Sequence, residues 1–157
     1  MKSTQYHHVE KNNTAKLSLA LLTPEEFLKF WPGIEKMLDT VPHTWRHWTK
    51  EYIYNAVLSG HIQVWCIGPP PYAVCVFFTS ISIHPAMRSF CVTWAGGSFD
   101  DEMVPLLEAG WMNYARANDC DEVAIYGREG WGPKLAKVGF RKDSVTWTRR
   151  VPNMRIN

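Results

Sequence analysis

Residues 94–140 read WAGGSFDDEMVPLLEAGWMNYARANDCDEVAIYGREGWGPKLAKVGF, and this stretch decides the predicted fold. Its glycine-rich turn precedes residues 100–118, whose apolar side chains recur at helical spacing and predict the longest helix of the chain. A strand at 122–126 and a short helix at 133–138 are predicted to follow. Because alternating strands and helices cover both faces of a sheet, the stretch favours an α/β class with a central mixed sheet.

The residues before and after this stretch are predicted to complete the same sheet. The sequence Thr23-Pro24-Glu25-Glu26 combines an N-cap, a first-turn proline and a capping-box glutamate, so a helix should begin there, and Pro32-Gly33 should kink or split it. The other predicted elements are strands at 17–22, 61–67, 72–83 and 89–95, a helix at 44–59, and one or two strands at 140–151. The resulting order is β-α-α-β-β-β-α-β-α-β.

The length and composition are those of a single globular domain. The chain has 157 residues, of which 46% are hydrophobic and 20% are charged. We expect the domain to span residues 17–151, after an N-terminal arm at 1–16 and before a C-terminal tail at 152–157. The N-terminal arm is polar and, taken alone, would be unstructured.

The charge balance argues against two classes of partner. Seventeen basic and fifteen acidic residues give a net charge of +2, too small for the basic footprint of a nucleic-acid-binding protein. The longest apolar run, 73–78, is far shorter than the roughly 20 residues that span a bilayer. We therefore expect no nucleic acid and no membrane among the partners, and a cytoplasmic location. Reduced cysteines are the default there, although a Cys66–Cys75 disulfide stays open.

The element order resembles that of the GNAT (GCN5-related N-acetyltransferase) fold, and the resemblance covers nearly all of residues 17–151. Residues 126–140, YGREGWGPKLAKVGF, are similar to the last helix and the Gly-Phe turn of that superfamily. They also resemble GNAT-like proteins encoded among the virion genes of tailed bacteriophages, in which a GRxGWxxxLxxxGF pattern recurs. The matching residues here are Gly127, Arg128, Gly130, Trp131, Leu135, Gly139 and Phe140.

The superfamily resemblance implies acyl transfer from acetyl-CoA to an amine, with the cofactor pyrophosphate bound by backbone amides at the start of the long helix. It implies that Gly96, Gly97 and Ser98 would bind this cofactor, but the superfamily's preceding Gln or Arg is missing here. The three carboxylates at 100–102 stabilise the helix start and would repel a pyrophosphate. The sequence therefore favours ordinary helix capping at this turn, and no cofactor.

The residues that would catalyse the transfer are also incomplete. The superfamily often places a tyrosine four residues before the glycine of the Gly-Phe turn, where it protonates the departing thiolate, and this chain has Leu135 there. Tyr126 could substitute, although packing is the simpler role. His61 and His84 are the available imidazoles for a general base, and both are typical of solvated strand ends. We accordingly predict no catalytic residue, with these three side chains as weak alternatives.

Metal and nucleotide sites are not predicted. His43 and His47 could share a helix face, but no third ligand accompanies them. The segment 127–134 superficially resembles a phosphate loop, yet Pro133 interrupts its Gly-Lys step and Leu135 replaces the hydroxyl that would bind magnesium.

Aromatic residues are more numerous than a core of this size requires. They make up 13% of the chain, with eight tryptophans, and tryptophan and arginine dominate the hot spots of protein interfaces. Arg128 and Glu129 lie in a loop that Trp131 could anchor. A recognition role for this loop and a surface ion pair over a packed Trp131 are equally compatible with the sequence. The excess predicts protein partners in a larger assembly. The candidate interface residues are Trp45, Arg46, Trp48, Arg128, Trp131, Arg149 and Arg150.

Two functions are compatible with these observations, with a small-molecule or peptide binder as a third. We favour a catalytically degenerate GNAT-fold protein that acts as a structural or interaction component of a tailed-phage virion, in the tail or the head–tail assembly, and is found in the host cytoplasm or the virion. The alternative is an active acetyl-CoA-dependent N-acyltransferase with a divergent pyrophosphate turn. The groove beside residues 96–101 distinguishes them, because Trp94 or Phe99 filling it would exclude the cofactor.

Overall fold

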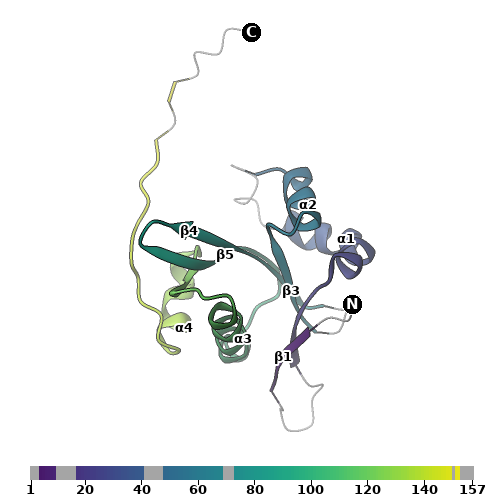
Figure 1. The fold of residues 1–157 in the computed structure, drawn as a ribbon, viewed down its shortest axis with the longest axis horizontal. Coiled ribbons are helices and arrows are strands. Elements are labelled where there is room, and N and C mark those ends of the chain that lie inside the picture. The colour runs from purple at the N-terminus through teal and green to yellow at the C-terminus, as the bar shows by residue number, and fades with distance from the viewer. Residues whose placement is uncertain (1–3, 10–16, 41–47, 69–72, 150, 153–157) are drawn as a thin grey trace.

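The computed structural model describes residues 4–9, 17–40, 48–68, 73–149 and 151–152 (Figure 1). Its centre is a six-stranded sheet whose strands lie side by side in sequence order. β5 and β6 run parallel, and the other neighbouring strands are antiparallel. The strands are β1 (Thr4–Val9), β2 (Leu17–Leu21), β3 (Gln63–Ile67), β4 (Cys75–His84), β5 (Met87–Gly97) and β6 (Glu122–Ile125).

Helices cover both faces of this sheet, which confirms the predicted fold class. On one face, α1 (Pro24–Asp39) and α2 (Lys50–Leu58) enclose an apolar core with Val76 and Phe78 of β4. On the other face, α3 (Val104–Ala117) packs over Phe77, and the short α4 (Gly132–Ala136) lies beside α3, with Leu135 near Leu107. Neighbouring residues of β4 thus contribute to opposite cores, as the alternation of side chains along a strand requires.

The start of α1 follows the sequence closely. Thr23 Oγ1 accepts a hydrogen bond from the amide of Glu26 at 3.2 Å, and the Glu26 carboxylate accepts one from the amide of Thr23 at 2.8 Å. This is the expected capping box. Pro32 does not split the helix, which remains one element to Asp39. Pro32 and Leu28, four residues earlier, are both exposed, so water can bind the carbonyl that proline leaves without a donor.

Other element ends differ by a few residues from those predicted. The helix expected at 44–59 begins at Lys50, where the Thr49 side chain caps it, and residues 44–47 lie outside the described part. The helix expected at 100–118 is split into a 3-10 turn, Asp101–Met103, and α3, because proline at position 105 favours the first turn of an α-helix.

The two ends of the chain contain the larger corrections. The N-terminal arm was expected to be unstructured, yet Thr4–Val9 pairs antiparallel with β2 and extends the sheet by one strand. The final strands expected at 140–151 were wrong, since the described residues 140–149 and 151–152 form no helix or strand. The sheet therefore ends at β6 on this side, within the part of the chain that the structure describes.

Candidate functional site

The parallel strand β6 pairs with β5 over its whole length and ends before β5 does. Their pairing ends at Val92 opposite Ile125, with one further bond of 3.0 Å from the Tyr126 amide to the Val92 carbonyl. β5 continues to Gly97, and Thr93 is an extra residue in its register with β4. A bulge bends the strand that carries it. The opening between the last residues of β5 and the chain that follows β6 is the natural place for a binding cleft in this fold.

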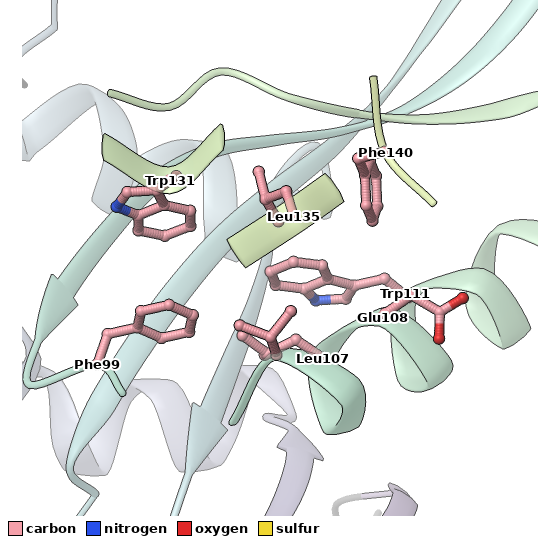
Figure 2. A pocket seen from close by; sticks show the side chains of 8 residues that line it. Phe99, Leu107, Glu108, Trp111, Trp131, Leu135 and Phe140 are labelled. Carbon is pink, nitrogen blue, oxygen red and sulfur yellow. The ribbon is translucent and has the colours of Figure 1, made fainter. Parts of the chain in front are cut away.

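Aromatic side chains fill this opening (Figure 2). The rings of Phe99, after β5, and Trp131, after β6, are stacked with centroids 4.8 Å apart and an interplanar angle of 7°. The remaining cavity measures about 10 Å³, room for no more than one water molecule. Its walls include Phe99, Leu107, Trp111, Trp131, Leu135 and Phe140. We call this set the aromatic plug.

An ion pair connects the two sides of the opening beside the aromatic plug. Lys134 Nζ of α4 lies 2.7 Å from Asp101 Oδ1 at the start of the 3-10 turn. The same ammonium lies 5.6 Å from the centroid of the Phe99 ring, within reach of a cation–π interaction. Hydrogen bonding to Lys134 lowers the pKa of Asp101 below its ordinary value. α4 is therefore attached to the turn after β5 by both charge and aromatic contact.

The glycine-rich turn is packed closely against neighbouring backbone. A Cβ on Gly96 would come within 2.8 Å of the Met37 carbonyl oxygen. At Gly97, φ is +94° and a Cβ would overlap the carbonyl oxygen of Val74. The Ser98 amide donates to that same oxygen at 2.8 Å. Gly96 and Gly97 thus have a structural reason to be glycine, and the Ser98 amide is already hydrogen-bonded.

Carboxylates occupy the start of the following turn. Asp100 is its N-cap, and its Oδ1 accepts a hydrogen bond of 2.9 Å from the amide of Glu102. Asp100, Asp101 and Glu102 are all exposed there. A coenzyme A pyrophosphate would meet these negative charges and a filled opening. The residues present do not fit that cofactor.

The side chains considered for catalysis lie apart from one another. His84 is exposed at the end of β4, and His61 is exposed before β3, with its Nδ1 2.7 Å from Ser59 Oγ. Tyr126 follows β6 and is 68% exposed, and the neighbouring Cys91 raises the pKa of its phenol. Leu135 lines the aromatic plug. The structure brings none of the three ionisable candidates together with another.

The residues considered for an interface are also dispersed. Trp48 precedes α2 and packs edge-to-face on Trp94 at 5.3 Å, on the sheet face opposite the aromatic plug. Trp131 belongs to the aromatic plug. Arg128 and Arg149 are exposed, whereas Trp45, Arg46 and Arg150 lie outside the described residues. Glu129, considered as an ion-pair partner of Arg128, pairs with Lys142 at 2.9 Å.

The described part of the chain contains neither a metal-ligand cluster nor a disulfide. No cluster of three His, Cys, Asp or Glu side chains is found there, and His43 and His47 lie outside it. Cys66 and Cys75 are buried free thiols, and burial raises the pKa of each to about 12. The described helices include none with the length and hydropathy required to cross a bilayer.

Sequence reasoning named Phe99 as a side chain that could close the groove, but missed its partners. Trp131 and Leu135 are four residues apart and share one face of the α4 region, which is a detectable signal. The ion pair of Lys134 with Asp101 spans 33 residues and carries no local signal. Trp94, the other side chain considered, packs on the opposite face of the sheet.

Comparison with known proteins shows the fold to be that of the GNAT acetyltransferases. An aminoglycoside acetyltransferase from an uncultured soil metagenomic sample, in complex with trehalose, aligns with a TM-score of 0.63 at 7% identity, over 87% of this chain and 97% of that one. A predicted acetyltransferase with acetyl-CoA from Clostridium acetobutylicum gives 0.61 at 10% identity, over 86% and 96%. A ribosomal-protein-alanine N-acetyltransferase from Brucella melitensis biovar Abortus gives 0.59 at 11%, over 87% and 99%. The sequence itself matches no protein-family model and no curated protein.

Proposed function

We propose that this chain is a catalytically degenerate GNAT-fold protein that acts as a structural or interaction component. The observation that carries the proposal is the stack of Phe99 on Trp131, which fills the opening between β5 and β6. A cofactor could occupy that opening only by separating the two rings. Such aromatic pairs contribute about 0.5–1.5 kcal/mol beyond the burial of their area, and that contribution would be lost on binding.

Electrostatics support the same proposal. The Asp100, Asp101 and Glu102 carboxylates surround the helix start that would have to accept a pyrophosphate. Lys134, the nearest cation described there, is already paired with Asp101 at 2.7 Å. Binding would break this ion pair and bring like charges together, and both changes oppose it. The position that should protonate a departing thiolate holds Leu135, which has no proton to give.

The role in a tailed-phage virion rests on the GRxGWxxxLxxxGF resemblance. Three of the matching residues, Trp131, Leu135 and Phe140, line the aromatic plug. Part of the pattern therefore consists of residues that pack together and close the cleft. This packing supports a structural role for the chain. Exposed apolar side chains, with Trp147 at 91% exposure, support contact with other proteins.

One observation favours the alternative, an acetyl-CoA-dependent N-acyltransferase. β5 carries a bulge and continues past the end of β6, so a ligand could lie beside its last residues. One structural neighbour holds acetyl-CoA. In this chain the alternative requires the aromatic plug to move aside.

Calorimetric titration with acetyl-CoA tests the choice. We expect no heat of binding and no shift in melting temperature up to millimolar cofactor, with the Clostridium acetobutylicum protein as a positive control. Micromolar affinity would overturn the proposal, and saturation at 100 times the Kd would then raise stability by about 2.7 kcal/mol. For the virion role, mass spectrometry of density-purified phage particles should find peptides of this chain. Detection in the infected lysate but not in the particles would contradict that role.

A further inference from the structure

The β4–β5 hairpin extends beyond its neighbour β3. β3 pairs with β4 only from Cys75 to Thr79, whereas β5 pairs with β4 as far as His84. Figure 1 shows the hairpin projecting past β3 and away from α1 and α2. Residues 80–84, here called the free edge of β4, therefore have a strand partner on one side only among the described residues.

Backbone groups of the free edge point outward. His84 and Met87 flank a two-residue turn, and the residues that flank such a turn are a hydrogen-bonded pair. Because hydrogen-bonded pairs occur at every second residue, Ser82 also bonds to β5, while Ile81 and Ile83 turn their amides and carbonyls to the other side. Within the described ranges, no residue is hydrogen-bonded to these outward groups. They can accept a further strand.

The side chains of the free edge divide into an apolar and a polar face. Ile81 packs against the core on the α3 side of the sheet, and Ile83 lies on the same face, 72% exposed. Ser80, Ser82 and His84 lie on the opposite face. Isoleucine favours strands, and an exposed isoleucine beside unpaired backbone is typical of a strand that pairs with another chain.

The free edge has none of the features that keep edge strands apart. Natural edge strands are protected by charged side chains, proline or a bulge. Residues 80–84 read SISIH, without lysine, arginine, aspartate, glutamate or proline, and the bulge between β4 and β5 lies in β5, at Thr93. At the start of β6, by contrast, the carboxylates of Asp121 and Glu122 are exposed. Association is therefore favoured at β4 rather than at β6.

The free edge is complementary to itself. In an antiparallel pair with a two-fold axis at Ser82, Ile81 of one copy lies opposite Ile83 of the other. Their outward amides and carbonyls then face each other, and their side chains meet on the apolar face. The lengths also match, because proline at position 85 ends one strand where β3 of the other copy begins at Gln63, opposite Thr79.

We propose that the free edge of β4 pairs with the same edge of a second copy of this chain, so that two sheets join across a two-fold axis at Ser82. A second copy is the partner because the isoleucines, the outward backbone groups and the length of the edge all match under this symmetry. Backbone hydrogen bonds supply affinity, and the isoleucine pairs fix the register. The inference goes beyond the proposed function, since the free edge and the aromatic plug lie at opposite ends of β5.

Charge changes at the symmetry axis test this pairing. Sedimentation equilibrium of the full chain should show an apparent mass that rises from 18.1 kDa toward twice that value as the concentration approaches about 1 mM. Ser82→Lys and Ser82→Glu each place like charges directly opposite one another, and each should weaken association by about tenfold. Mixed in equal amounts, the two variants should associate with each other as tightly as the parent does. The controls Ser82→Ala and Leu28→Lys, the latter at an exposed site on α1, should associate as the parent does.

Hydrogen exchange identifies the edge that pairs. The amides of Ile81 and Ile83 should exchange slowly in concentrated parent protein, and rapidly in dilute protein and in Ser82→Lys. The Ser80 amide bonds to β5 in either state, so it is the internal control. Unchanged far-ultraviolet circular dichroism would show that each variant is folded.

Four results would each overturn the inference. They are a mass that stays at 18.1 kDa at about 1 mM, charge variants that associate as well as the parent, a mixture of the two charge variants that associates no better than either alone, and exchange at Ile81 and Ile83 that is independent of concentration. Acetyl-CoA enters none of these measurements, so failure here is distinguishable from failure of the proposed function. Cofactor binding by a chain that still pairs through β4 would overturn the proposed function alone.

Discussion

A double-mutant cycle on Phe99 and Trp131 measures how strongly the two sides of the opening are held together. Fully buried Phe or Trp side chains cost about 3–5 kcal/mol when cut to alanine. Both rings here are half-buried, so about 2 kcal/mol is expected for each single variant. Their stacking at 4.8 Å and 7° predicts a coupling energy of about 1 kcal/mol. The double variant should therefore lose about 3 kcal/mol rather than about 4.

Urea unfolding followed by far-ultraviolet circular dichroism gives each free energy without relying on tryptophan emission. The control cycle combines Phe99→Ala with Leu28→Ala, which lies on α1 over the other face of the sheet. These two changes should be additive within about 0.3–0.5 kcal/mol. A coupling between Phe99 and Trp131 no larger than that of the control cycle would refute the reasoning, since the stack would then not hold the opening shut.

Three further predictions concern the turn, the ion pair and the thiols. Gly97→Ala places a Cβ over the Val74 carbonyl at φ +94°, so it should cost more than about 1 kcal/mol, whereas Gly130→Ala, with no atom within 4 Å, should stay within about 0.5 kcal/mol. Lys134 lowers the pKa of Asp101, so the ionised carboxylate stabilises the fold at pH values above the ordinary aspartate pKa. This stabilisation is lost as the pH falls through the folded-state pKa of Asp101. The difference in urea midpoint between the parent and Lys134→Met should therefore shrink from pH 7 to pH 3. With pKa values of about 12, the thiols of Cys66 and Cys75 should resist iodoacetamide at pH 8 until the protein unfolds, while half-buried Cys120 reacts first, as peptide mass mapping would show.

Local chemistry made much of the fold predictable. The capping box at Thr23 needs only four residues, and it is present. Gly60, after α2, and Gly139, after α4, have φ values of +81° and +93°, a conformation typical of glycine at the end of a helix. Alternating apolar runs located β3 to β5 within a few residues.

Non-local contacts were not predictable in the same way. The bulge at Thr93 places Trp94 on the face opposite to Val92, whereas simple alternation would place both on one face. β1 forms because β2 offers an edge, not because its own polar sequence demands a strand. Residues 144–149 illustrate the converse, because their sequence is typical of a strand and the structure assigns no strand there.

In the candidate site, too, the local features were predictable from the sequence and the non-local contacts were not. The missing proton donor at Leu135 and the carboxylates after Ser98 were legible from the resemblance and from charge. The closure of the opening depends on Phe99 meeting Trp131, 32 residues away, at a distance that only the folded chain sets.

The most direct measurement of whether the opening is closed is a titration of the ¹⁵N-labelled chain with acetyl-CoA, followed by the amide resonances of Gly96, Gly97 and Ser98. These amides should keep their chemical shifts at a tenfold excess of cofactor, because the aromatic plug and the acidic turn leave no room for its phosphates. Saturable shifts at these three amides, together with the indole resonance of Trp131, would contradict the account.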